Sequence, residues 1–161
     1  MTIAIYPGTF DPITTGHVSV VREAVRLFAH VRVLIARHPT KEPLFTLEER
    51  VELARAVLGA LPTVSVASTP GLVVEYARSI GATALVRGLR GAADAAYETE
   101  LAQQNRAIAP EIITVMLPAE PRLSAVSSSE LKARAKRGEP IDEYCPSAIA
   151  ERVLARFVEA P

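Results

Sequence analysis

The sequence has very little cysteine and no long apolar run, and these absences exclude several classes of protein. Among 161 residues there is one cysteine, Cys145, which rules out an intrachain disulfide and a cysteine-based zinc cluster. A single cysteine suits a reducing cytoplasm, which is the location that we expect. The apolar runs are too short for a transmembrane helix. No basic stretch followed by an apolar segment opens the chain, so we expect neither a membrane partner nor a signal peptide.

An excess of charge of one sign is missing as well. Eighteen basic and 18 acidic side chains give a formal net charge of zero and a pI of about 6.8, which argues against nucleic acid as a partner. No Gly-x-x-x-x-Gly-Lys-Ser/Thr motif is present, so the chain is not a P-loop protein. No Gly-x-Gly-x-x-Gly motif follows the first apolar run either. With 49% hydrophobic residues, the chain has the composition of a globular domain.

Apolar runs of strand length alternate with helical patterns along the chain. Strands are predicted at residues 2–6, 31–36, 64–67, 82–86 and 112–117, and helices at about 16–29, 46–58, 71–79, 91–109, 127–138 and 146–158. This alternation predicts an α/β fold: a single doubly wound, Rossmann-like domain over residues 1–161, with a five-stranded parallel sheet and helices on both faces. Ligands of such sheets bind beyond the C-terminal ends of the strands, near the switch in strand order.

The stretch from Tyr6 to His17 is the most informative part of the chain. It reads Tyr-Pro-Gly-Thr-Phe-Asp-Pro-Ile-Thr-Thr-Gly-His and connects the first strand to the first helix. Such a turn presents free N–H groups and the positive end of a helix dipole to an anion. His17 lies in the first helical turn, where its ring can point at the same anion, so the stretch is typical of a phosphate site.

The loops after four strands carry the other unusual residues, and all should lie at one edge of the sheet. They are Thr9 and His17, Lys41, Arg87 with Gly88 and Arg90, and the serines 127–129. Taken singly, each has an ordinary explanation, because an isolated histidine is usually structural, loop lysines are usually solvated and serines cap helices. Together they predict a site for several phosphates. Glu98 is either a solvated helix residue or an acceptor at this edge.

The same residues carry a resemblance to a known family. Thr14-Thr-Gly-His17 resembles the T/H-x-G-H signature of the nucleotidyltransferase superfamily. The fuller set, which also includes residues 6–14, Phe45-Thr-Leu-Glu-Glu-Arg50, Arg87-Gly-Leu-Arg90 and Ser127-Ser-Ser129, is similar to the bacterial phosphopantetheine adenylyltransferase family. The match runs in order through nearly the whole chain. It implies transfer of AMP from ATP to 4′-phosphopantetheine, which gives dephospho-coenzyme A and pyrophosphate, with Mg²⁺ as the cofactor.

The resemblance also implies roles for individual residues. His17 should stabilise the transition state, with Lys41 and Arg90 as further catalytic groups. Thr9, Lys41, Val73 and Arg87 should bind phosphopantetheine. The residues that should bind ATP are Thr9, Phe10, His17, Gly88, Leu89, Arg90, Glu98, Leu123, Ser124, Ala125, Val126, Ser127, Ser128 and Ser129. Thr15, Leu123 and Ala125 depart from the family's pattern, in which asparagine is common at the first position and aromatic residues are frequent at the other two.

Alternatives to this function stay open at the level of the sequence. A related adenylyl- or cytidylyltransferase acting on nicotinate mononucleotide or glycerol phosphate would have the same T-x-G-H element. A catalytically silent nucleotide-binding module is a second alternative, whereas a tRNA-synthetase fragment is excluded by its absent second signature.

The resemblance further implies a homohexamer and feedback inhibition by coenzyme A. No direct metal ligand is predicted, although Asp11 and Asp94 are candidates, because the triphosphate can bind most of the Mg²⁺.

Overall fold

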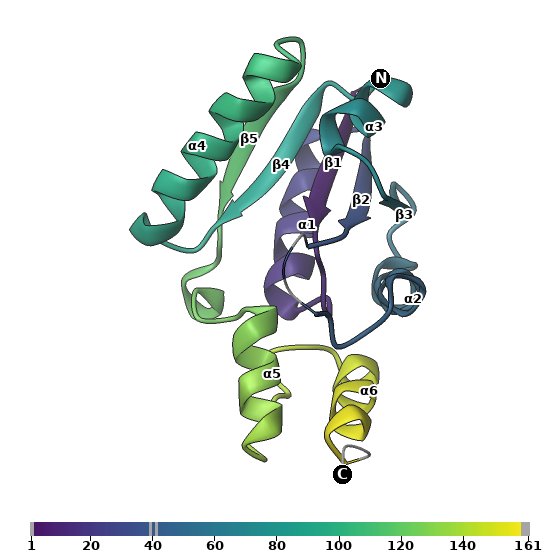
Figure 1. Ribbon diagram of the computed structural model, residues 1–161, viewed down its shortest axis with the longest axis vertical. Coiled ribbons are helices and arrows are strands. Elements are labelled where there is room, and N and C mark those ends of the chain that lie inside the picture. The colour runs from purple at the N-terminus through teal and green to yellow at the C-terminus, as the bar shows by residue number, and fades with distance from the viewer. Residues whose placement is uncertain (1, 39, 41, 159–161) are drawn as a thin grey trace.

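The structure, a computed structural model, describes residues 2–38, 40 and 42–158. Five strands form one parallel sheet in the order β3-β2-β1-β4-β5 (Figure 1). The strands are β1 (Ile3–Gly8), β2 (His30–Ala36), β3 (Val64–Thr69), β4 (Ala84–Leu89) and β5 (Ile113–Pro118). The central pair, β1 and β4, is the point where the strand order reverses. The predicted five-stranded parallel sheet is confirmed.

Helices cover both faces of this sheet, as predicted. Helices α1 (Thr15–Leu27) and α2 (Leu47–Leu58) share the larger apolar core with Ala4, Val33 and Val86. On the opposite face, α3 (Val73–Ser79) packs against Ile5 and Leu85. Helix α4 (Ala92–Ile108) crosses β4 and β5 on the same side as α3 (Figure 1). The alternation of side chains along each buried strand supplies both cores.

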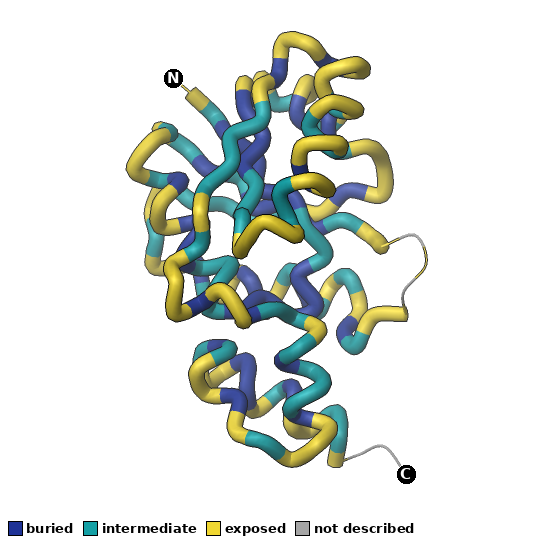
Figure 2. The backbone as a smooth tube through the Cα atoms, turned by 90° about the vertical axis from the view of Figure 1, so that its left-hand side faces the viewer, coloured by how far each residue is buried: buried dark blue, intermediate teal, exposed yellow. Residues whose placement is uncertain are grey.

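The last two helices occupy a position that the sequence pattern did not predict. Helices α5 (Ser128–Lys136) and α6 (Ser147–Val158) lie beyond the C-terminal edge of the sheet, as a smaller lobe below it (Figures 1 and 2). Leu131 of α5 and Ile149 of α6 are fully buried and belong to the same core as α1 and α2. The first turn of α5 is thereby brought next to the end of β1.

Local signals placed most helix ends correctly, but three strands run two or three residues further than predicted: β1 ends at Gly8 rather than Tyr6, β3 at Thr69 rather than Ala67, and β4 at Leu89 rather than Val86. Thr46 caps α2 and Glu49 returns the bond to the Thr46 N–H, so the predicted capping box is confirmed. The predicted end of the fourth strand at Val86 is wrong, because β4 continues to Leu89. The reason is its partner: β5 pairs with β4 as far as Leu89↔Pro118, so Arg87 and Gly88 lie within a strand rather than a loop.

A short 3-10 helix, η1 (Pro121–Leu123), interrupts the connection between β5 and α5 and was not predicted. Across residues 2–38, 40 and 42–158, no helix has both the length and the apolar character that a membrane span requires.

Candidate active site

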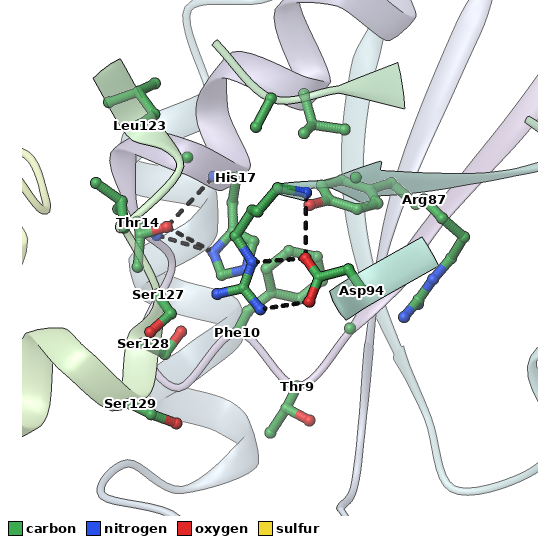
Figure 3. A pocket seen from close by; sticks show the side chains of 18 of the residues that line it. Thr9, Phe10, Thr14, His17, Arg87, Asp94, Leu123, Ser127, Ser128 and Ser129 are labelled. Carbon is green, nitrogen blue, oxygen red and sulfur yellow. Dashed lines mark hydrogen bonds and ion pairs between the residues drawn. The ribbon is translucent and has the colours of Figure 1, made fainter. Parts of the chain in front are cut away.

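A pocket of about 290 Å³ opens at the C-terminal ends of β1 and β4, where the strand order reverses. The sequence predicted a site at this edge. The predicted residues that line the pocket are Thr9, Phe10, His17, Arg87, Gly88, Arg90, Glu98, Leu123, Val126, Ser127, Ser128 and Ser129. Figure 3 shows His17 and the three serines on one side and Arg87 on the other. Three separate stretches of the chain, within residues 6–20, 87–98 and 119–129, therefore converge here.

The His17 ring is fixed by its place in the first turn of α1. Thr14 is the N-cap, and its side chain accepts from the His17 N–H at 3.3 Å. In return, His17 Nδ1 lies 3.0 Å from the Thr14 backbone nitrogen, which donates to it (Figure 3). Because Nδ1 accepts this bond, the proton of the neutral ring lies on Nε2. Nε2–H is therefore the group that His17 can donate to an anion.

The charge state of His17 agrees with this tautomer. Burial, together with the positive charges of Arg90 and Arg87, lowers the pKa of His17 from 6.5 to about 4. The imidazole is neutral at pH 7, so it acts as a hydrogen-bond donor rather than as a cation or an acid. A neutral donor can stabilise the charge that develops on a phosphate, and unlike an imidazolium it is not repelled by the two arginines.

Stability should reveal the lowered pKa of His17. In the unfolded chain the ring titrates near 6.5, and in the folded protein near 4, so its contribution is fully present above pH 6.5 and is lost as the pH falls towards 4. Between pH 7 and pH 5 we expect the wild type to lose about 2 kcal/mol more unfolding free energy than His17→Asn. Urea unfolding at both pH values measures this, and equal losses would contradict the assignment.

The loop before His17 is tightly packed. Phe10 is 2% exposed and has a φ of 46°, in the left-handed region that non-glycine residues seldom adopt. Its ring makes edge contacts with Tyr6 and His17, at centroid distances of 5.3 and 4.8 Å. A Cβ on Gly8 would lie 2.9 Å from that ring, so glycine is required there. The strained backbone is held by this aromatic packing, which also orients the imidazole.

Arg87 is held by a partly buried ion pair. Its Nε and Nη2 donate to the Glu98 carboxylate at 2.6 and 2.9 Å, and its Nη1 donates to the Pro7 carbonyl at 3.0 Å. Burial alone would lower the pKa of Arg87, but the hydrogen bonds and charge of Glu98 raise it above its ordinary value. Three of the five guanidinium N–H groups are thus occupied, and two are free for a ligand. Glu98 fixes the direction in which they point.

Arg90 is held more weakly. It pairs with Asp94 at 3.0 Å, and the Arg90 side chain is 45% exposed. The hydrogen bond from Arg90 lowers the pKa of Asp94. Because exposed ion pairs contribute little stability, a phosphate can replace the Asp94 carboxylate as the partner of Arg90. The two pocket arginines therefore differ, since Arg87 is fixed in place and Arg90 is exchangeable.

The N-terminus of α5 forms another wall of the pocket. Ser127 is its N-cap and accepts from the Glu130 N–H at 3.0 Å, as predicted. Ser128 Oγ donates to the Pro12 carbonyl at 2.8 Å, which ties this turn to the loop after β1. The first-turn amides of Ser128 and Ser129 have no carbonyl partner within a helix, so they are available to a phosphate.

Some predicted residues lie elsewhere. Val73 is the first residue of α3, Leu89 is the last of β4, and Ser124 and Ala125 follow η1; none of the four lines this pocket. Ala125 lines a neighbouring pocket, and that pocket shares Leu123 and Val126 with the first. Lys41 lies outside the described residues.

Sequence reasoning missed two residues that organise the site. Thr14 sets the tautomer of His17, and the signal was present, because Thr-x-x-His has the spacing of a capping box with histidine in the position of glutamate. Asp94, a candidate metal ligand from the sequence, pairs with Arg90, and this pairing was not predicted. Within the described residues, no group of three or more histidine, cysteine or acidic side chains could hold a metal ion.

Comparisons with known proteins agree with this geometry. Residues 5–134 match the family model described as cytidylyltransferase-like. Phosphopantetheine adenylyltransferase from Desulforudis audaxviator is 47% identical over 96% of this chain and 94% of its own length, and that from Levilactobacillus brevis is 42% identical over 98% of both.

A crystal structure of a putative nicotinate-nucleotide adenylyltransferase from Vibrio parahaemolyticus has the same fold. Its TM-score is 0.75 at 19% identity, and the similarity covers 99% of this chain and 98% of that one. At this identity the likeness concerns the fold alone. The 42–47% identity to the two relatives above, over nearly the full length of each chain, decides the family. The chain belongs to the phosphopantetheine adenylyltransferases.

Proposed function

We propose that the protein transfers the adenylyl group of ATP to 4′-phosphopantetheine, giving dephospho-coenzyme A and pyrophosphate in a reversible step of coenzyme A biosynthesis. The proposal rests above all on the 38–47% identity, over nearly the full length, to relatives named for this activity. The pocket has suitable chemistry, because neutral and cationic donors converge on one cavity at the switch point of the sheet.

The reaction needs no activated nucleophile from the protein. A phosphate oxygen of phosphopantetheine is already anionic, so it can attack the α-phosphorus of ATP directly. The bond from that phosphorus to the pyrophosphate oxygen then breaks, and no covalent enzyme intermediate forms. The remaining tasks are to hold two polyanions in line and to stabilise the charge that develops on the phosphates.

On the ATP side, these tasks would fall to His17, Arg90 and the amides of Ser128 and Ser129. His17 Nε2–H would donate to a phosphate oxygen whose charge rises in the transition state. Arg90 would exchange Asp94 for the triphosphate. Phe10, Gly88, Leu123 and Val126 line the same pocket and would pack around the nucleotide, and Leu89, Ser124 and Ala125 would extend this wall.

On the acceptor side, Arg87 and Thr9 would bind the phosphate of phosphopantetheine, together with Lys41. Thr9 lines both the main pocket and an adjoining one of about 330 Å³, whose other walls include Arg37, Pro43 and Thr46. That second pocket lies against the connection from β2 to α2, which carries Lys41. Val73 would contact the pantetheine arm. Glu98 would act by fixing Arg87, because its carboxylate is already engaged by the guanidinium.

Magnesium fits the site as a companion of ATP. Both acidic side chains that line the pocket, Asp94 and Glu98, are paired with arginines, and the described residues hold no cluster of three ligating side chains. Mg²⁺ commonly binds through substrate phosphates and one or two carboxylates. It would therefore reach the site on the triphosphate and offset its charge, with Asp94 available once Arg90 turns to the nucleotide.

The proposal also covers the location of the protein, its oligomeric state and its inhibition. We propose a cytoplasmic homohexamer that is inhibited by coenzyme A, which contains the chemical groups of the product. Exposed apolar side chains on α4 support association, because Tyr97 is 64% and Ile108 is 48% exposed while Glu98 is the one buried residue of that helix. A single buried cysteine, Cys145, is compatible with a reducing compartment.

A side-by-side test of acceptors examines the proposal. Purified protein is given ATP and Mg²⁺ with 4′-phosphopantetheine, nicotinate mononucleotide or glycerol 3-phosphate, and pyrophosphate release is measured. We expect release with phosphopantetheine and a rate at least about 100-fold lower with the other two, because a site built to bind one polar ligand rejects analogues that leave its groups unpaired. Release with another acceptor alone would move the protein to a related activity. ATP binding without any release would favour the silent module.

A further inference from the structure

Asp11 is a buried carboxylate that lies outside the main pocket and has no part in the mechanism above. Its residue is 3% exposed. Oδ2 accepts from the Leu44 N–H at 2.8 Å and Oδ1 from the Phe45 N–H at 2.9 Å. Lys132 Nζ donates to Oδ2 at 2.8 Å. Both oxygens are thus used by protein donors, which disfavours the sequence-based hypothesis that Asp11 binds the metal.

Asp11 and its partners belong to three different segments around the site. Asp11 itself follows Thr9 and Phe10 in the loop after β1. Leu44 and Phe45 end the connection from β2 to α2, which lies against the adjoining pocket. Lys132 is on α5, one turn after Ser128 and Ser129. One carboxylate therefore joins three segments. They are the β2–α2 connection on the proposed acceptor side, the loop that leads to His17, and α5, whose first-turn amides would bind the triphosphate.

Three further hydrogen bonds connect the loop after β1 to its neighbours. Arg50 Nη1 donates to the Thr9 carbonyl at 2.8 Å and to the Ala36 carbonyl at 3.2 Å, which ties the loop after β1 to the end of β2. Ser128 Oγ donates to the Pro12 carbonyl. These bonds hold neighbouring points of the backbone, but Asp11 is the residue that forms an ion pair with Lys132. Burial makes such bonds costly to lose, because each donor is then left without an acceptor.

We propose that Asp11 is a positioning residue for adenylyl transfer, whose carboxylate sets the distance between the ATP side and the acceptor side of the site. This inference rests on the proposed function. In-line transfer depends strongly on the placement of the reacting groups, and an error of 1 Å costs about 100-fold in rate. Because Asp11 touches both sides, its loss should affect both substrates. Lys132 links Asp11 to α5 alone, so its loss should affect chiefly ATP.

The test compares Asp11→Asn, Lys132→Met, the double variant and a matched control. In Asp11→Asn the amide nitrogen would face the Lys132 ammonium or a backbone N–H, so a donor would oppose a donor. We expect kcat/KM to fall about 10- to 100-fold for ATP and for phosphopantetheine. We expect Lys132→Met to lower kcat/KM for ATP about 10-fold and to change the KM for phosphopantetheine less than about twofold. The double variant should recover part of the activity lost in Asp11→Asn.

The control is Glu111→Gln, which removes a carboxylate from its ion pair with Arg78 at the opposite end of the sheet. It should leave kcat and both KM values unchanged. Thermal melting of each variant separates stability from activity, since a purely structural role would change the melting temperature without the difference between substrates. If Asp11→Asn does not fold, Lys132→Met decides: a kcat/KM for ATP within twofold of the wild type would overturn the proposal.

Equal losses for both substrates in Lys132→Met would overturn it too, as would a double variant no more active than Asp11→Asn. If the proposed function itself were wrong, the wild type would release no pyrophosphate with phosphopantetheine, and this result is distinct from a wrong role for Asp11.

Discussion

Replacing His17 with alanine should lower kcat about 10²- to 10³-fold, with a change in the KM for ATP of less than about threefold. The neutral ring, held by Thr14, offers Nε2–H to a phosphate oxygen. A donor of this kind contributes most when the negative charge on that oxygen increases, which happens in the transition state. Steady-state kinetics with phosphopantetheine saturating and ATP varied measures both constants.

His30→Gln is the matched control for this variant. His30 is a histidine of β2 that contacts Ser65 and lies outside the pocket lining, so its replacement should leave kcat unchanged. A His17→Ala enzyme with wild-type kcat would refute the assigned role. A large rise in the KM for ATP at constant kcat would instead make His17 a ground-state binding residue.

Replacing Arg87 with methionine should have two separable effects. The KM for phosphopantetheine should rise about 100-fold, because a bidentate charged contact to the acceptor phosphate is lost. The free energy of unfolding should fall by about 3–5 kcal/mol, because Glu98 is left as a buried carboxylate without its partner. Acceptor kinetics and urea unfolding measure the two effects independently.

The double variant Arg87→Met/Glu98→Met distinguishes the two roles. Removing both charges together should restore most of the stability, because replacing a buried ion pair by apolar side chains is often neutral. It should not restore the KM for phosphopantetheine. Recovery of acceptor binding along with stability would contradict the role given to Arg87 and would mean that the pair acts by supporting the fold.

The sequence could predict most of the fold because its signals are local. The Thr46–Glu49 capping box and the Ser127 cap depend on residues three positions apart. The end of β4 could not be predicted from local signals, because pairing with β5 as far as Pro118 determines it. Likewise, the place of α5 and α6 below the sheet depends on where Leu131 and Ile149 are buried.

The candidate site, too, could be predicted only in part from the sequence. The predicted edge of the sheet brings His17, Arg87 and Arg90 into one pocket. The sequence could not show which carboxylate engages which arginine. It also could not assign a structural task to Asp11, whose partners lie 33 and 121 positions away in the sequence. Long-range pairing of charged side chains leaves no periodic pattern, so the interactions that shape the site become visible only in the folded chain.

The fate of a labelled α-phosphate tests the central claim most directly. ATP that carries ³²P at the α-position is incubated with the protein, Mg²⁺ and 4′-phosphopantetheine, and the products and the protein are separated. The account predicts label in dephospho-coenzyme A in equal amount to the pyrophosphate released, with none bound to the protein. Label on the protein, or label left in free AMP with no dephospho-coenzyme A, would contradict direct transfer.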